Sequence, residues 1–216
     1  MILDRTTTAY HYLRNGIITG EFPEGLPIRE MDVAESLQMS RSPVREAIRL
    51  LEREGVLTIY PARGAFVNTL TPHDVEEICE LRILHELYAL EKAIKKITVE
   101  DLEKIEAAFR ITYERRDWDS YHQVDYDFHD LIVRKCGSPR LLNFICTLNF
   151  QIERLRRYMA QNPHRMEESF REHLQIIKYI RLCELQMAKL EMEKHLREVM
   201  FSYLETHKLI SSECSS

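Results

Sequence analysis

SRSPVREAIRLLEREG, residues 40–55, is the stretch that decides the fold of this chain. Its apolar side chains recur at the i, i+3, i+4, i+7 spacing of a helix with one buried face, namely Val44, Ala47, Ile48 and Leu51. We expect Ser42 to cap this helix and Pro43 to take its first position, where the missing N–H costs nothing. Gly55 is expected to end it. The other face carries arginines and small hydroxyls, which is typical of a helix that enters a DNA major groove.

The segments around residues 40–55 predict a small winged unit. Residues 6–19 and a short segment after Glu30 predict two helices, and a tight connection joins the second to residues 40–55. Two helices joined in this way have helix-turn-helix spacing. Two β-branched and aromatic runs follow, around a turn with Pro61 and Gly64, and they predict a hairpin wing. Gly64 is expected to have a positive φ at the wing tip.

The rest of the chain predicts helices. Glycine (6) and proline (7) are scarce among the 216 residues, which favours a mostly helical protein. Six helices are expected after a linker at residues 69–72, and capping or first-position signals stand at Thr98, Asp117, Ser138-Pro139 and Asn162-Pro163. The predicted fold class is mainly α, with an N-terminal winged helix-turn-helix in residues 1–70 and an all-α six-helix bundle in residues 71–216.

Composition and charge exclude several classes of protein. The five cysteines are odd in number and lack a C-x-x-C pair, which favours reduced thiols in a cytoplasmic protein. No apolar run approaches the ~18–20 residues that span a bilayer, so we expect no membrane partner. The net charge of −5 does not by itself indicate a nucleic-acid binder. Residues 1–70 contain arginine but no lysine, and these arginines cluster after position 41, so their placement would have to provide any DNA contact.

In its N-terminal part the chain resembles the GntR family of bacterial transcription factors. That resemblance rests on SRSPVREAIRLLE at 40–52, on RGAFV at 63–67, and on Gly20, Pro23, Gly25, Gly55 and Pro61. The second domain is similar to the FCD effector domain of the FadR-type branch in its six-helix form. That match rests on Arg82 with Glu86, on DYDFH at 125–129, on Glu172-His173 and on His195. The two sets of motifs occur in the expected order and cover nearly the whole chain.

The resemblance implies a ligand-responsive DNA-binding transcriptional regulator rather than an enzyme. Members of the family bind short palindromic operators in double-stranded DNA as homodimers. Their helical domain dimerises and binds a small carboxylate effector, often beside a divalent metal. In most relatives of this type the effector lowers operator affinity, so we expect a repressor that the effector releases. Ser42 stands where threonine is commoner, which is a chemically mild departure.

The DNA-binding residues are expected on residues 40–55 and on the wing. Arg41 and Arg45 are the expected base contacts, because an arginine fork matches guanine. Phosphate contacts are expected from Ser40, Ser42 and Arg49, and from Arg63 beside Gly64, which would reach a phosphate or the minor groove. The alternative is a solvated helical face with ordinary Glu–Arg pairs, for which Glu46 and Glu52 provide the acids.

A metal site is expected inside the bundle. Asp125 and His129 are spaced i, i+4 and so share one helical face. His173 and His195 lie on apolar faces of two other predicted helices, and such residues converge in the cores of helix bundles. Nitrogen and oxygen ligands without thiolate suit a divalent transition metal, Zn²⁺, Ni²⁺, Mn²⁺ or Fe²⁺, rather than Ca²⁺. The alternative is a set of satisfied core histidines with an Asp–His hydrogen bond.

The effector is expected beside this metal. Arg82 would clamp a carboxylate, since guanidinium matches its geometry. His122 lies near the ligands on the same helix, and both a pocket-lining and a structural role stay open. Two other functions compete with regulation by an effector. One is a metal-dependent hydrolase, since a site of one Asp and three His can activate water, although no obvious general base is present. The other is an effector-independent dimeric DNA-binding protein whose bundle only dimerises.

Overall fold

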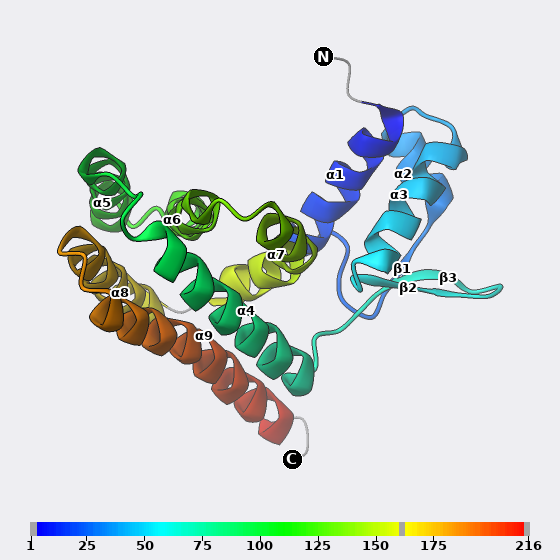
Figure 1. The fold of residues 1–216 in the computed structure, drawn as a ribbon. Helices are drawn as coiled ribbons and strands as arrows, with labels where there is room; N and C mark the ends of the chain where they lie inside the picture. Colours follow the sequence, from blue (N-terminus) through cyan, green and yellow to red (C-terminus); the bar gives the residue numbers. More distant parts are fainter. Residues whose placement is uncertain (1–3, 160–162, 214–216) are drawn as a thin grey trace. The chain divides into compact units, whose positions relative to one another are not determined.

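The computed structural model describes residues 4–159 and 163–213. By their internal contacts the residues form two compact units, 1–71 and 72–216. Figure 1 shows three helices and a small sheet in the first unit and long helices in the second. The predicted fold class, mainly α with an N-terminal winged helix-turn-helix, is confirmed.

The first unit is a winged helix-turn-helix. Its described elements are α1 (Arg5–Thr19), β1 (Pro27–Ile28), α2 (Glu30–Ser36), α3 (Arg41–Arg53), β2 (Leu57–Tyr60) and β3 (Gly64–Val67). The predicted hairpin is β2 and β3, with Thr58 opposite Phe66 in antiparallel register. Strand β1 pairs with the other edge of β3, so the strand order is β1-β3-β2. This third strand was not predicted, because two residues that include a proline carry no alternating pattern.

The apolar face of α3 forms the core of the first unit. Its predicted residues Val44, Ala47, Ile48 and Leu51 are all buried, and Ala9 and Leu13 of α1 are buried with them. The predicted start of this helix was wrong. Ser40 is the extended N-cap residue and Arg41 begins the helix, so Ser42 does not cap it and Pro43 is its third residue. Proline is tolerated there because the first four N–H groups of a helix have no intrahelical partner.

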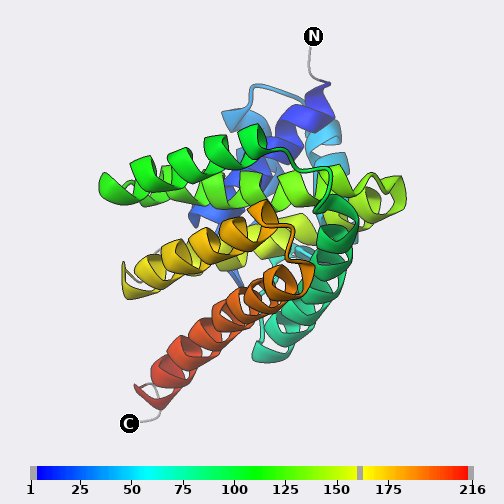
Figure 2. The same cartoon turned by 60° about the vertical axis from the view of Figure 1, so that its left-hand side comes forward.

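The second unit is a bundle of helices. Six helices are described in it: α4 (Pro72–Ala93), α5 (Val99–Glu114), α6 (Trp118–Cys136), α7 (Pro139–Met159), α8 (Pro163–Arg181) and α9 (Leu185–Glu213). Helix α4 packs against α6, α7 and α9, and Figure 2 shows α8 and α9 side by side. The buried aromatic residues Phe109, Tyr121 and Phe128 lie at the centre. Among the described helices, none has a stretch long and apolar enough to cross a membrane.

Local capping explains where several of these helices begin. Thr98 and Asp101 form the predicted capping box, with N···O distances of 2.9 and 3.1 Å. Asp117 caps α6 by accepting from the Ser120 N–H at 3.1 Å. The Ser138 hydroxyl accepts from Leu141 N at the start of α7. Asn162, expected to precede the helix at Pro163, lies outside the described residues.

Candidate functional site

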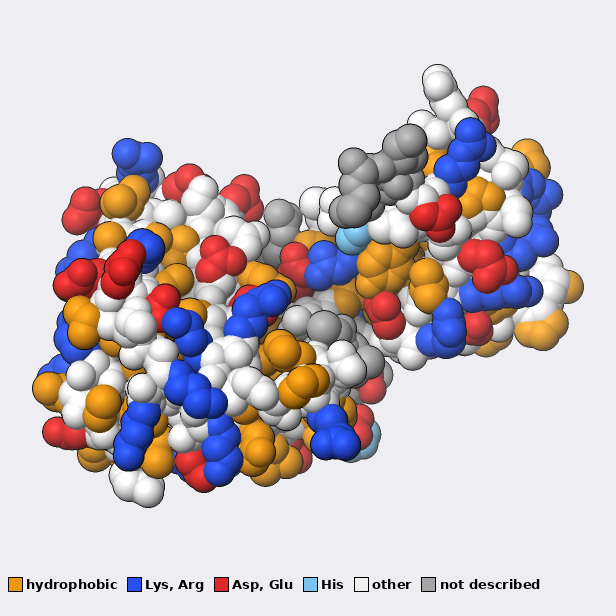
Figure 3. All heavy atoms as spheres, turned by 45° about the horizontal axis from the view of Figure 1, so that its top comes forward, with side chains coloured by type: hydrophobic (Ala, Val, Ile, Leu, Met, Phe, Trp, Pro, Cys, Tyr) orange, Lys and Arg blue, Asp and Glu red, His pale blue; other side chains and the backbone are white. Residues whose placement is uncertain are grey.

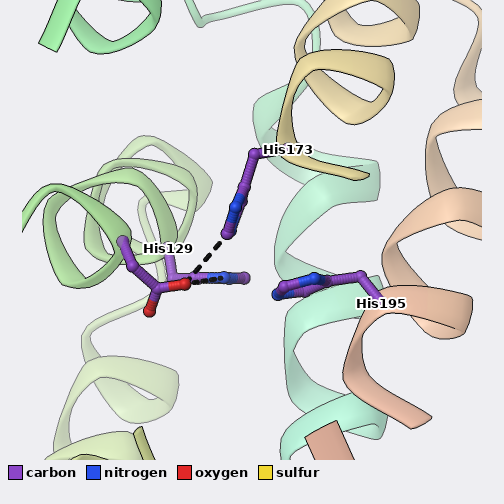
Figure 4. A group of neighbouring side chains, drawn as sticks. His129, His173 and His195 are labelled. Carbon is purple, nitrogen blue, oxygen red and sulfur yellow. Dashed lines mark ion pairs between the residues drawn. The ribbon is translucent and has the colours of Figure 1, made fainter. Parts of the chain in front are cut away.

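The four side chains predicted as metal ligands lie together in the bundle. Asp125 and His129 come from α6, His173 from α8 and His195 from α9, and all four are buried. One possible ligand atom from each residue lies within 4.8 Å of the other three. Figure 4 shows the rings of the three histidines turned toward a shared space between these helices.

The Nε2 atoms of the three histidines face this space. Each Nε2 is buried, and none has a hydrogen-bond partner among the described residues. The Oδ1 atom of Asp125 is near, at 3.1 Å from Nε2 of His173 and 3.8 Å from Nε2 of His129. Unpartnered buried nitrogen atoms are unfavourable, and a bound cation would satisfy all three at once.

The other ring nitrogen of each histidine, Nδ1, has a hydrogen-bond partner on the side away from the shared space. Nδ1 of His129 lies 2.5 Å from Oε2 of Glu86, and Nδ1 of His195 lies 2.7 Å from Oε2 of Glu172. An ionised carboxylate only accepts, so both Nδ1 atoms donate and the lone pair of each ring remains on Nε2. Nδ1 of His173 has two hydroxyls at 3.2 Å, those of Tyr121 and Ser169.

Burial and neighbouring charges hold His129, His195 and Asp125 in the protonation states that metals bind. Burial lowers the pKa of His129 to about 4, against the opposing charge of Glu86. The pKa of His195 is well below its usual value, first because of burial and then because of the neighbouring histidines. Burial would raise the pKa of Asp125, but the Arg156 guanidinium and the neighbouring His173 ring hold it well below its usual range. His129 and His195 are therefore neutral imidazoles, and Asp125 is an ionised carboxylate, near neutral pH.

Three buried arginines surround the ligands. Arg82 donates from Nε to Oε1 of Glu86 at 2.6 Å, and Arg156 forms an ion pair with Oδ2 of Asp125. Arg165 makes a bidentate contact with Glu172, at 2.8 and 3.2 Å. Sequence reasoning singled out Arg82 and missed the other two, because arginine on an amphipathic helix is ordinarily exposed. No local pattern in the sequence indicated that these two arginines are buried. The partner of Arg156 is Asp125 on another helix, and the partner of Arg165 is Glu172, seven residues further along α8.

A pocket lies beside the cluster. It encloses about 350 Å³, part of it open to solvent, and it includes the three buried arginines together with Asp125 and His195. Its other lining residues are Tyr121, His122, Met166, Ser169 and Val199. His122, whose place was left open, therefore lines the pocket, and Arg82 lies where an effector contact was expected.

The predicted DNA-binding residues are all exposed on the first unit. Ser40, Ser42 and the arginines of α3 are exposed. Figure 3 shows arginines interspersed with carboxylates on the visible face of this unit. Arg49 pairs with Glu46 at 3.0 Å, as the solvated-face alternative expects. At the wing, Gly64 has the predicted positive φ of 93°, and the Arg63 guanidinium lies 5.4 Å from the ring centre of Phe66.

Comparison with known proteins supports the family resemblance. Residues 5–67 match the gntR family of bacterial regulatory proteins, and residues 77–198 match the FCD domain. The HTH-type transcriptional regulator YdhC of Bacillus subtilis (strain 168) is 30% identical over 190 residues, 86% of this chain and 85% of YdhC. The HTH-type transcriptional repressor RspR of Escherichia coli (strain K12) is 27% identical over 193 residues, 88% of this chain and 85% of RspR.

A solved structure shares the fold. The crystal structure of a GntR transcriptional regulator from Rhodococcus sp. RHA1 superposes with a TM-score of 0.80 at 21% identity, covering 93% of this chain and 98% of that one. YdhC is named as an HTH-type transcriptional regulator and RspR as an HTH-type transcriptional repressor. With both family models matched in order along the chain, this protein belongs to the GntR family of bacterial regulatory proteins and carries an FCD domain.

Proposed function

We propose that this regulator is a repressor that a small carboxylate releases from its operator by binding beside a divalent metal. The observation that carries the proposal is the convergence of three unpartnered Nε2 atoms on the Asp125 carboxylate, in the unit that follows a winged helix. Asp125, His129, His173 and His195 would hold the ion. Three imidazole nitrogens and one carboxylate suit Zn²⁺, Ni²⁺, Mn²⁺ or Fe²⁺. Such an ion, when bound, offers open coordination positions to a carboxylate oxygen.

The pocket beside this cluster is suited to an anion. Its guanidinium groups carry positive charge into a buried space, and guanidinium forks match carboxylate geometry. Nη2 of Arg82 is buried without a hydrogen-bond partner among the described residues. Leaving a buried charged donor unpaired is costly, so a carboxylate oxygen placed there would gain a strong hydrogen bond.

The DNA-binding surface is proposed on α3 and the wing. Arg41 and Arg45 would contact bases, and Ser40, Ser42 and Arg49 would contact phosphates, with Arg63 and Gly64 at the wing. A single winged unit, with nine acidic against eight basic residues in residues 1–70, would bind DNA weakly. A homodimer that presents two copies of α3 to a palindromic operator provides the missing affinity.

Exposed apolar side chains support dimerisation by the second unit. Leu84 and Tyr88 lie one turn apart on α4 and are 69% and 49% exposed. Phe144 of the neighbouring helix α7 is 46% exposed, and its ring lies 6.3 Å from that of His85 on α4. Clusters of exposed large apolar residues mark interaction surfaces. We therefore assign the dimer contact to this part of α4 and α7.

Helix α4 offers a route from the effector to the DNA-binding unit. It begins at Pro72, directly after the first unit, and it carries both Arg82 and Glu86. An effector that binds Arg82 therefore contacts α4, the helix that directly follows the winged unit in the chain. Binding would shift the population of DNA-competent dimers, with a coupling of ~1–3 kcal/mol. We propose repression rather than activation because the similar protein RspR is a transcriptional repressor.

The hydrolase alternative has little support among the described residues. Besides Asp125, the carboxylates that contact the histidines of the cluster are Glu86 and Glu172, and each already accepts from a histidine Nδ1 and an arginine. A general base must lie within hydrogen-bond reach of the proton that it abstracts, and these two carboxylates are instead directed at the histidine Nδ1 atoms and the arginines.

A thermal-shift screen with a library of carboxylates, with and without a chelator, tests the proposal. One compound should raise the melting temperature of the metal-loaded protein, by an amount equivalent to ~2.7 kcal/mol at 100 times its dissociation constant. The same compound should release a fluorescent operator duplex in an anisotropy titration, and the chelator should abolish both effects. If no carboxylate stabilises the protein, the bundle is an effector-independent dimerisation unit. If the compound tightens DNA binding, the repressor assignment is wrong.

A further inference from the structure

One carboxylate joins the two arginines proposed to read bases. Glu30, the first residue of α2, accepts from Arg45 Nε at 3.0 Å and Arg45 Nη2 at 2.9 Å, and from Arg41 Nη2 at 3.0 Å. These partners are 11 and 15 residues from Glu30, so the contacts join α2 to α3. The arginine side chains stay 56% and 49% exposed, whereas that of Glu30 is 25% exposed.

The contact leaves the base-reading edge of Arg45 unused by Glu30. A guanidinium has a side-on edge, made of Nε and Nη2, and an end-on edge, made of the two Nη groups. Glu30 occupies the side-on edge of Arg45. The end-on edge presents two parallel N–H donors, the pair that fits O6 and N7 of guanine. A guanidinium held on one edge has a fixed direction on the other, so less side-chain freedom is lost when it binds.

The Glu30 carboxylate also weakens contacts between these arginines and DNA phosphates, which do not depend on the base sequence. Glu30 is ionised at neutral pH, because the hydrogen bond from Arg45 lowers its pKa more than burial raises it. A fixed negative charge between two arginines weakens their attraction to phosphates, which provides most of the affinity for unrelated DNA. Guanine edges carry no net charge and are less affected.

We propose that Glu30 is the specificity-determining residue of this surface: it positions Arg41 and Arg45 to read guanine and restrains them from acting as phosphate clamps. The inference rests on the proposed function, in which α3 enters the major groove. It also distinguishes these two arginines from Arg49, whose partner Glu46 lies one turn away on the same helix. Both members of that pair are more than half exposed, and such pairs restrict an arginine little.

The experiment compares full-length wild type with Glu30→Gln, Glu30→Asp and the matched control Glu46→Gln. Each protein selects duplexes from a randomised DNA library. Its affinity is then measured for the duplex that wild type selects, for a shuffled duplex, and for the selected duplex with 7-deazaguanine, which lacks N7, at each guanine in turn. Melting temperatures are measured on the same samples.

Wild type should prefer the selected duplex and lose affinity wherever 7-deazaguanine removes a contacted N7. Glu30→Gln should bind the shuffled duplex at least as tightly as wild type, while its preference for the selected duplex falls about 10-fold and the 7-deazaguanine losses shrink. Glu30→Asp keeps the charge but is too short to hold both arginines, so it should lose preference without gaining affinity for the shuffled duplex. Glu46→Gln should keep the wild-type preference and losses.

Two outcomes overturn the inference. One is a Glu30→Gln protein that keeps the wild-type preference and the 7-deazaguanine losses. The other is an equal loss of affinity for both duplexes together with a lower melting temperature, which would make Glu30 a structural residue only. A wild-type protein that selects no sequence would instead refute the proposed DNA-binding function itself.

Discussion

Nδ1 of His129 lies 2.5 Å from Oε2 of Glu86, so a carboxylate on α4 fixes the direction in which a ring on α6 presents its Nε2. Partners of this kind fix the tautomer of a ligand and raise its basicity. Replacing Glu86 by Gln should therefore weaken metal binding about 10- to 100-fold without removing a ligand. Competition with a metal-binding dye measures the change.

Glu91→Gln is the matched control for this prediction. Glu91 is on the same helix, but it pairs on the surface with Lys92 and Lys189. Its replacement should leave metal affinity at the wild-type value. Equal metal affinity in Glu86→Gln and wild type would show that Glu86 does not orient the ligand.

Arg82→Lys should weaken the effector and spare the metal. Lysine keeps the charge beside Glu86 but lacks the planar fork, so a carboxylate loses one directed hydrogen bond. We expect the effector affinity to fall about 10-fold, since hydrogen bonds to charged groups contribute ~1.5–3 kcal/mol. Calorimetry with the carboxylate from the thermal screen measures it, and dye competition should give an unchanged metal affinity.

Arg110, an exposed arginine that pairs with Glu106, provides the control for Arg82→Lys. Arg110→Lys should change neither affinity. A carboxylate that binds Arg82→Lys as tightly as wild type would remove Arg82 from the effector site.

Much of this architecture could be predicted because its signals are local. The caps at Thr98 and Asp117 and the i, i+4 pair of Asp125 and His129 are patterns within one turn of helix. Strand β1 carried no such signal, since its two residues are defined only by pairing with β3. The predicted start of α3 was misplaced because Ser40, and not Ser42, is the N-cap residue.

The residues that hold the metal-ligand candidates in place could not be predicted from the sequence. Arg156 lies 31 positions after its partner Asp125, and Glu172 holds a histidine 23 residues away on another helix. Such pairs depend on how helices pack, which periodicity does not determine. Each arginine by itself carries the pattern of an exposed residue.

Leu84→Glu should separate the dimer. A charge placed among exposed apolar side chains of α4 and α7 would be buried without a partner when two copies associate. Sedimentation velocity should show a monomer, and operator affinity should fall because the two copies of α3 are no longer linked. Ile111→Glu changes a comparably exposed residue of α5 and should leave the dimer intact. A dimeric Leu84→Glu protein would place the contact elsewhere.

Tyr10→Phe should destabilise the winged unit with a characteristic pH dependence. The Tyr10 hydroxyl donates to both oxygens of Glu54, at 3.0 and 2.9 Å, and so ties α1 to the end of α3. Its loss should cost about 1 kcal/mol of unfolding free energy, a reduced value because the pair is only part-buried. Tyr12→Phe removes an exposed hydroxyl bond to nearby Glu21 and should change the free energy by less than ~0.5 kcal/mol.

The pH dependence of Tyr10→Phe follows from the pKa of Tyr10, which burial and then Glu54 raise to about 12. The unfolded chain has a tyrosine pKa of about 10. A pKa raised in the folded state gives stability that is fully present below pH ~10 and is lost as pH rises through about 12. The difference between wild type and Tyr10→Phe should therefore shrink over that interval. Urea denaturation of the full chain, followed by far-UV circular dichroism at a series of pH values, measures it. A difference that grows with pH would mean that Glu54 does not hold the Tyr10 proton.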